Sequence, residues 1–301
     1  MAVACLFLIM KLYEIGRQVN WDRIYNHKWA VVLVISGYTL MILCSPLSYK
    51  VLVKIITGAE IPFYEIRSLY CKTNLYKYLP GNVFQYVGRN QLAVEKNLGH
   101  TQIALATMLE ILLTVAVSVL TAVIFSKDAL AHWFGSNESL YLYVAAGLVL
   151  IAVMLLIAVL FRDKFGKIWK RMGTLFSFQG AVGMLFAITW LFLMMVMNGV
   201  LFGSVMNMTG NALSRKERHT VIGLFALSFC IGYLTPGAPG GVGVRETMLL
   251  VFLGKTVDEA QTVAAVVIYR VISVLGDVFA YWLAAAMGHF ITKREDKRWR
   301  N

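Results

Sequence analysis

Charged residues are scarce in this chain, and the few that occur are unevenly placed. Only 15% of the 301 residues are Asp, Glu, Lys or Arg, whereas soluble domains carry about 25%. Hydrophobic residues make up 59% of the sequence, and the charges gather between long apolar runs. A bilayer core imposes this segregation. The sequence therefore excludes an ordinary soluble domain and predicts an all-α membrane protein.

Cysteine and histidine are also few, which excludes several kinds of site. Cys5, Cys44, Cys71 and Cys230 have no paired spacing, so we expect small buried residues rather than disulfides or a metal centre. The five histidines form no HExxH or Cys/His cluster. The chain has neither a Gly-x-Ser-x-Gly nucleophile motif nor a Walker-type phosphate loop. We therefore predict no metal, no cofactor and no enzyme activity.

Acidic residues are outnumbered, and the formal net charge is +12. The Lys and Arg residues cluster in loops beside apolar runs, which favours contact with anionic lipid and argues against nucleic-acid binding. The basic loop 162–171 and the basic tail 293–301 are predicted to be cytoplasmic, and the weakly charged loop 127–138 to face outward. In this orientation the basic residues at 215–218 would also lie outside. The topology still leaves the tail in the cytoplasm if 220–254 enters the membrane and returns to the same side, so that 260–290 crosses back in.

Seven apolar runs approach the length of about 20 residues that a helix needs to cross a bilayer. The first lacks a basic start and a cleavage site, so we interpret it as a helix rather than a signal peptide. With two further runs broken by Pro and Gly, 75–99 and 236–254, they predict a polytopic helical bundle of about seven to eight spans. The expected spans are 1–16, 29–49, 102–126, 139–161, 180–206, 220–235 and 260–290.

No hydrophilic stretch is long enough for a separate soluble domain, so we expect one membrane domain over 1–301. It divides into a first half at about 1–126 and a second half at about 139–292, followed by the tail 293–301. The longest mixed stretch, 50–101, is aromatic and basic. Such a sequence predicts an interfacial helix that leads into a re-entrant segment.

The two broken segments resemble each other in the order of their residues. Each has a Pro-Gly pair, then an arginine, and each ends in Leu-Gly before a long apolar run. The second segment has additional prolines and glycines. The break residues are Pro80 and Gly81 in the first segment, and Pro236, Gly237, Pro239, Gly240, Gly241 and Gly243 in the second.

Two such interruptions at corresponding places in two halves indicate a transporter-like binding site. Broken backbone at membrane depth must be buried in protein or line a wet cavity. We expect a half-helix to start near Val244 and to direct its positive end toward an anion. The alternative is that the glycines only permit close packing of helices.

These residues resemble a known family. Pro-Gly-Gly-Val-Gly-Val-Arg-Glu at 239–246, Leu-Pro-Gly and Gly-Arg within 79–89, and Tyr269-Arg270 are similar to the flippase-type transmembrane region of lysylphosphatidylglycerol synthases. The resemblance covers about 29–290. It implies movement of an anionic, aminoacylated or polyprenyl-linked lipid between leaflets. The chain shows no aminoacyltransferase domain, so the resemblance implies a stand-alone member without synthase activity. The Arg-Trp pair that the family has after its second span is not evident, and Tyr49-Lys50 stands near that place.

Charged residues inside apolar spans are costly and are therefore candidates for function. We expect the three arginines to hold a lipid phosphate, because a guanidinium matches phosphate geometry. The three acidic candidates would neutralise these arginines when the site is empty, or would bind a cationic headgroup. The alternative is that Arg270 pairs with Glu110 or Asp277 only to lock the bundle. The candidate substrate-binding residues are Arg89, Glu110, Arg245, Glu246, Arg270 and Asp277.

The sequence thus favours a lipid flippase with a central polar cavity. Two other functions stay open: a non-transporting membrane partner of a separate glycosyl- or aminoacyltransferase, and an intramembrane lipid-modifying enzyme. The expected partners are membrane lipids and, for the anchoring function, that transferase; a homo-oligomer is an open alternative. We expect a bacterial or archaeal cytoplasmic membrane and a cytoplasmic C-terminus.

Overall fold

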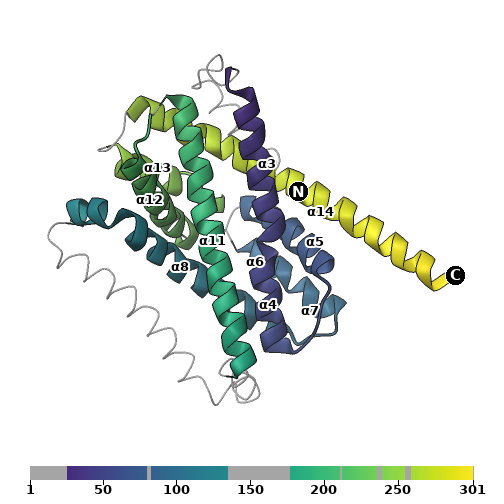
Figure 1. The fold of residues 1–301 in the computed structure, drawn as a ribbon. Helices are drawn as coiled ribbons and strands as arrows, with labels where there is room; N and C mark the ends of the chain where they lie inside the picture. Colours follow the sequence, from purple (N-terminus) through teal and green to yellow (C-terminus); the bar gives the residue numbers. More distant parts are fainter. Residues whose placement is uncertain are drawn as a thin grey trace.

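The computed structural model describes residues 26–79, 83–134, 177–210, 212–235, 239–254 and 259–300. Within these ranges the ordered elements are helices and no strand occurs, so the expectation of an all-α protein is confirmed there (Figure 1). The expected spans 1–16 and 139–161 lie outside the described residues. So do four of the predicted break residues: Pro80, Gly81, Pro236 and Gly237.

Four stretches of the described chain are long and apolar enough to cross a membrane, which indicates a multi-pass membrane protein. They match the expected spans at 29–49, 102–126, 180–206 and 260–290. The first stretch consists of two helices, α3 and α4, which meet at Ser45. The four stretches are Lys28–Thr57 (α3, Lys28–Cys44, with α4, Pro46–Thr57), His100–Leu130 in α8 (His100–Phe134), Phe178–Thr209 (α11) and Gln261–Ile291 in α14 (Glu259–Arg300).

The ends of the first stretch follow from its sequence. Pro46 is the first residue of α4, where its missing N–H costs no hydrogen bond, so the chain continues in nearly the same direction. Gly58 then ends α4 with φ 74°, in the left-handed region that favours glycine. The span therefore reaches beyond the predicted end at 49.

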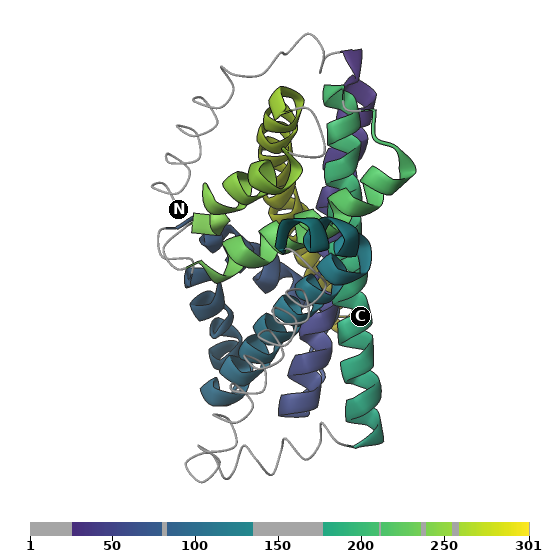
Figure 2. The ribbon, with the colours of Figure 1, turned by 90° about the vertical axis from the view of Figure 1, so that its left-hand side faces the viewer.

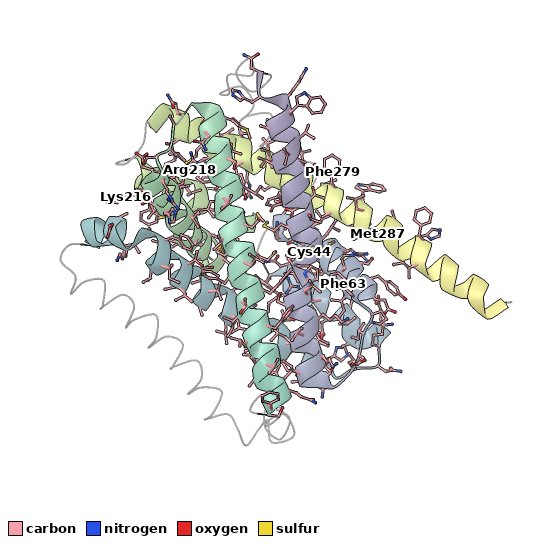
Figure 3. All side chains as sticks on the ribbon, in the orientation of Figure 1. Cys44, Phe63, Lys216, Arg218, Phe279 and Met287 are labelled. Carbon is pink, nitrogen blue, oxygen red and sulfur yellow. The ribbon has the colours of Figure 1, made fainter. Side chains whose placement is uncertain are left out.

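The expected span 220–235 is a helix, α12 (Arg215–Leu234), but it is not among the four apolar stretches. Its first turn carries Arg215, Lys216, Glu217 and Arg218, which lower its hydropathy. Lys216 Nζ lies 3.6 Å from Asp128 Oδ2 of α8, so the start of α12 and the end of α8 lie together (Figure 3).

Both halves place the same sequence of elements before their last long helix. A helix is followed by one 3-10 turn and by short helical segments. In the first half these are α5 (Phe63–Asn74), η1 (Leu75–Tyr78), α6 (Phe84–Arg89) and α7 (Gln91–Glu95), before α8. In the second half they are α12, η3 (Pro239–Gly241) and α13 (Val244–Leu253), before α14. The predicted start of a half-helix at Val244 is confirmed.

The two halves interlock rather than pack as separate bodies. Helix α5 of the first half packs against α14 of the second, and α12 of the second packs against α8 of the first. The turns η1 and η3 contact each other where these pairs meet, and α11 packs against both pairs. Figure 2 shows the short helices lying between the two ends of α11 and not beyond them.

Small residues allow α12 to lie close to both of its neighbours. A Cβ atom on Gly199 of α11 would lie 2.9 Å from the Cα of Ile222, and one on Gly223 would lie 2.8 Å from the backbone N of Ser126. Ser126 is also the point where α8 departs from helical geometry, with φ −132°. These two glycines, which lie outside the broken segments, therefore serve close helix packing.

An aromatic cluster holds the second half together. The rings of Phe202, Phe225 and Tyr269 contact one another with centroids 5.2–5.5 Å apart. They join α11, α12 and α14, and each is at most 4% exposed.

In contrast, the outer face of α14 is apolar and exposed: Phe279 and Met287 lie on the part of this helix that extends away from the bundle (Figure 3). Such a face suits contact with lipid chains.

Candidate functional site

A cavity of about 180 Å³ lies where the two interlocked halves meet. One water molecule needs roughly 10–15 Å³ of such space, so the cavity has room for several waters or for a small headgroup. Four of the six predicted site residues line it: Arg89, Glu110, Arg245 and Arg270. Glu246 lies beside a smaller space lined also by Arg245 and Arg270. Asp277 is outside the cavity lining, behind Lys77 and Tyr78, which are part of it.

Arg89 at the end of α6 is enclosed on every side. It forms an ion pair and hydrogen bond with Glu110 of α8, and both residues are at most 4% exposed. Its guanidinium lies over the rings of Tyr70, Tyr49 and Tyr86, at 4.1, 5.1 and 5.6 Å from their centroids. The hydroxyl of Tyr70 donates to the other carboxylate oxygen of Glu110, at 3.3 Å. The charge of Arg89 is therefore neutralised by the protein itself.

Asp277 of α14 ties the second half to the first. Its carboxylate is 1% exposed and accepts hydrogen bonds from Asn74 Nδ2 at 2.8 Å and from the Tyr78 hydroxyl at 2.5 Å. Lys77 Nζ lies 2.7 Å from the same carboxylate and supplies its counter-charge. All three partners come from the C-terminal end of α5 and from η1.

The pairing of Arg270 differs from the sequence-based alternative. Arg270 does not pair with Glu110 or Asp277; its Nη1 lies 3.5 Å from Glu246 Oε1 and donates to the Gly240 carbonyl at 3.2 Å. Asp277 is seven residues further along α14, about 10.5 Å along the helix axis, too far for direct pairing. Glu246 of α13, from the same half, pairs with Arg270 instead, and Lys77 of η1, from the other half, pairs with Asp277.

The N-terminus of α13 is capped from within the chain. Glu246 Oε2 accepts a hydrogen bond from the Gly243 backbone N–H at 2.7 Å. The positive helix end that was expected to meet an external anion is thus met, at this N–H group, by the carboxylate of Glu246. Glu246 therefore serves both the helix start and Arg270.

Three glycines make the turn into α13 possible. Gly240, Gly241 and Gly243 have φ values of 58°, 71° and 85°, in the left-handed region that L side chains rarely adopt. The turn places the Gly240 carbonyl against Arg270. A Cβ on Gly240 would lie 3.2 Å from Arg270 Nη2, so a larger residue would crowd this contact. Pro239 begins η3, so it and these glycines lie in the turn between α12 and α13.

Arg245 has a different environment from the other two arginines. Its guanidinium lies over the rings of Phe225 and Phe229, 4.4 and 5.2 Å from their centroids. Its Nη2 is buried and makes no hydrogen bond within the described chain. No described carboxylate lies within ion-pairing distance of Arg245, although it lines the cavity.

The charges of this region can be counted. Four cations (Lys77, Arg89, Arg245 and Arg270) stand against three carboxylates (Glu110, Glu246 and Asp277), and each carboxylate pairs with one cation. One positive charge remains, and it belongs to Arg245. Within the described ranges, the site therefore carries a formal charge of +1 and suits an anion.

Several site residues were missed by the sequence analysis. Asn74, Lys77 and Tyr78 were included in a stretch expected to lie at the membrane interface, but Asn74 and Tyr78 are buried against Asp277. Their spacing of three and four residues places them on one helical face. A polar face within an otherwise apolar and aromatic stretch was the available signal.

Comparison of the chain with models of known protein families and with curated proteins finds no match.

Proposed function

We propose that the protein is a membrane flippase that moves a lipid with an anionic headgroup between leaflets through this cavity. The observation that carries the proposal is the unpaired guanidinium of Arg245. A buried charge without a partner is unfavourable, so an anion that enters the cavity would gain the interaction that the protein leaves open. Phosphate is the suited anion, because the guanidinium fork matches its oxygens.

The proposal assigns different tasks to the candidate residues. Arg245 and Arg270 contact the phosphate, since both line the cavity and both have a buried Nη2 without a hydrogen bond in the described chain. Arg89 holds α6 to α8 through Glu110. Glu246 and Asp277 act as counter-charges that fix Arg270 and Lys77.

The resemblance to the transmembrane region of lysylphosphatidylglycerol synthases supports the same function. The segment 239–246, which carries much of that resemblance, forms η3 and the start of α13 beside the cavity. The resemblance extends the range of cargo to aminoacylated and polyprenyl-linked lipids. Both have a phosphate next to a long apolar chain.

We further propose that the complete bundle has about seven to eight spans and two re-entrant segments, one before α8 and one before α14. The matching order of elements in the two halves supports this arrangement, as does the position of the short helices between the ends of α11 (Figure 2). The proposed location is a bacterial or archaeal cytoplasmic membrane with the C-terminus in the cytoplasm.

Reconstitution tests this function. Purified protein is placed in liposomes with a fluorescent phospholipid in the inner leaflet, and the fraction that reaches the outer leaflet is followed by chemical quenching. Wild type should accelerate the exchange of an anionic phospholipid, and Arg245→Gln should abolish the acceleration at equal amounts of folded protein. The matched control is Lys54→Gln, a cation that is exposed and outside the cavity.

Three outcomes would oppose the proposal. Unchanged exchange with Arg245→Gln would remove Arg245 from the transport path. A chemically altered lipid, detected by mass spectrometry of the same liposomes, would support an intramembrane enzyme. Absence of exchange of any lipid, together with a transferase that copurifies from native membranes, would support the anchoring function.

A further inference from the structure

We propose that the cavity selects amphiphiles whose headgroup carries one negative charge, so that the charge of the preferred ligand follows the charge of the cavity. The inference rests on the proposed function, because it concerns the same site, and it adds the substrate class. A phosphodiester with an otherwise neutral headgroup is the simplest ligand of this kind.

The charge balance of the site sets the number of negative charges on the preferred ligand. The three internal ion pairs use all three carboxylates and three of the four cations. A ligand with one negative charge neutralises Arg245 and leaves no charge in excess. A ligand with two negative charges would bring one charge without a partner into a buried site. A zwitterionic or aminoacylated headgroup would leave its own cationic group opposite Arg245, so the charge rule excludes the aminoacylated cargo that the resemblance alone allows. Both alternatives are disfavoured by the same desolvation argument.

The place of the phosphate follows from the open hydrogen-bonding groups. Arg245 Nη2 and Arg270 Nη2 are both buried and without a hydrogen bond in the described chain. The two arginines line both the main cavity and the smaller space beside it. Two guanidinium groups that line the same spaces suit the two non-bridging oxygens of a phosphodiester.

The other wall of the cavity indicates an amphiphile and not a water-soluble anion. Met41 and Ile42 of α3 face the cavity together with Leu191, Met194 and Met195 of α11. Helices α3 and α11 pack against each other along this wall (Figure 1). Methionine side chains are flexible and unbranched, so they adapt to an apolar chain of variable conformation.

A competition experiment with charge variants tests the inference. The purified protein in detergent binds a fluorescent short-chain phosphatidylglycerol, which is displaced by unlabelled short-chain lipids of net charge zero, minus one and minus two: phosphatidylcholine, phosphatidylglycerol and phosphatidic acid. The buffer is alkaline enough to remove the second proton of phosphatidic acid. Wild type should prefer phosphatidylglycerol over both others by at least about tenfold. Inorganic phosphate and glycerol phosphate should compete much more weakly, because they lack the apolar chain.

The variants shift the charge of the cavity in both directions. Arg245→Gln lowers the charge of the cavity to zero and should weaken the binding of phosphatidylglycerol without weakening that of phosphatidylcholine. Glu246→Gln raises it to +2 and should move the preference to phosphatidic acid, while the amide oxygen can still cap Gly243. The double variant Arg245→Gln/Glu246→Gln has a charge of +1 again and should regain the preference for a single negative charge. Glu60→Gln, an exposed acid outside the cavity, is the control and should leave the order unchanged.

The outcomes separate this inference from the proposed function. If lipids are exchanged between leaflets but the order of preference ignores the variants, the flippase proposal stands and the charge rule is wrong. If the order follows the charge but no lipid is exchanged, the charge rule stands and the flippase proposal is wrong. Equal competition by inorganic phosphate and by lipid would overturn the assignment to an amphiphile. A double variant that keeps the preference of either single variant would also contradict the charge rule.

Discussion

Arg89 and Arg245 occupy matching positions in the two breaks, yet the protein surrounds them differently. Arg89 has a carboxylate and three tyrosine rings around it, whereas Arg245 has two phenylalanine rings and, among the described residues, no acid within ion-pairing distance. A shared sequence pattern therefore does not imply a shared task. In the first segment the arginine is neutralised by Glu110, and in the second Arg245 has no carboxylate within ion-pairing distance among the described residues.

The strongest test of this comparison is the removal of the acid from the first break. Glu110→Gln leaves Arg89, only 4% exposed, without a counter-charge. We expect a loss of about 3–5 kcal/mol in the free energy of unfolding, measured by denaturant titration in mixed micelles. The double variant Arg89→Gln/Glu110→Gln should recover much of the loss. A cost no larger than that of the exposed control Glu60→Gln would show that the first break is not held by this pair.

The contact between the halves should be the next most sensitive point. Asp277→Asn removes the counter-charge of Lys77 but can keep one of the hydrogen bonds to Asn74 and Tyr78. Because Lys77 is 19% exposed in its side chain, we expect a smaller loss than for Glu110, about 2–3 kcal/mol. The same titration measures it. If Lys77→Gln added to Asp277→Asn gives no recovery, the lysine is not the group that the aspartate balances.

Removal of the second arginine should hardly change stability. Arg245→Gln takes away a charge that has no partner, so we expect the free energy of unfolding to change by less than about 1 kcal/mol. Lipid exchange, in contrast, should be lost. A destabilisation as large as that of Glu110→Gln would contradict the difference between the two breaks.

The smallest effect concerns the helices that lead into the breaks. Glu217 in the first turn of α12 forms a capping box with Ser214: its carboxylate accepts a hydrogen bond from the Ser214 backbone N–H, and its own backbone N–H donates to the Ser214 hydroxyl. Hydrogen bonding with the side chain and backbone of Ser214 lowers the pKa of the Glu217 carboxyl below 4.5. Helix α5 starts after Pro62 without a side-chain cap. A lowered pKa gives stability that is present above the unfolded value and is lost as the pH falls through the folded value. Below about pH 4.5 we therefore expect faster hydrogen exchange at the start of α12 only, and solvent screening of this exposed carboxyl keeps the effect small. Ser214→Ala should reduce this pH dependence, and an equal acid response in α5 would contradict the assignment.

Much of the helical frame could be predicted from the sequence, because long apolar runs and Gly/Pro punctuation are local signals. The expected spans at 102–126 and 180–206 lie within α8 and α11, and the start of α13 falls at Val244. The same signals located the six charged candidates. Four of them, Arg89, Glu110, Arg245 and Arg270, line one cavity because the helices that carry them interlock.

The partners within the site could not be predicted. Tyr78 and Asp277 are 199 residues apart in the chain, and helical periodicity indicates a face but not the helix that it meets. Glu246, next to Arg245 in sequence, turns to Arg270 and to the start of its own helix. The neighbouring acid thus leaves Arg245 open, which only the folded arrangement decides.

The interlocked halves also constrain how the protein is made. Lys77 and Tyr78 are synthesised long before Asp277, which lies on α14. Asp277 supplies the counter-charge of Lys77 and accepts the hydrogen bond of the Tyr78 hydroxyl. Until that helix enters the membrane, η1 carries the Lys77 cation without a carboxylate from its own half among the described residues. The first half is therefore expected to stay loosely inserted and accessible to insertion factors or proteases during translation. Final assembly would then be governed by the arrival of α14.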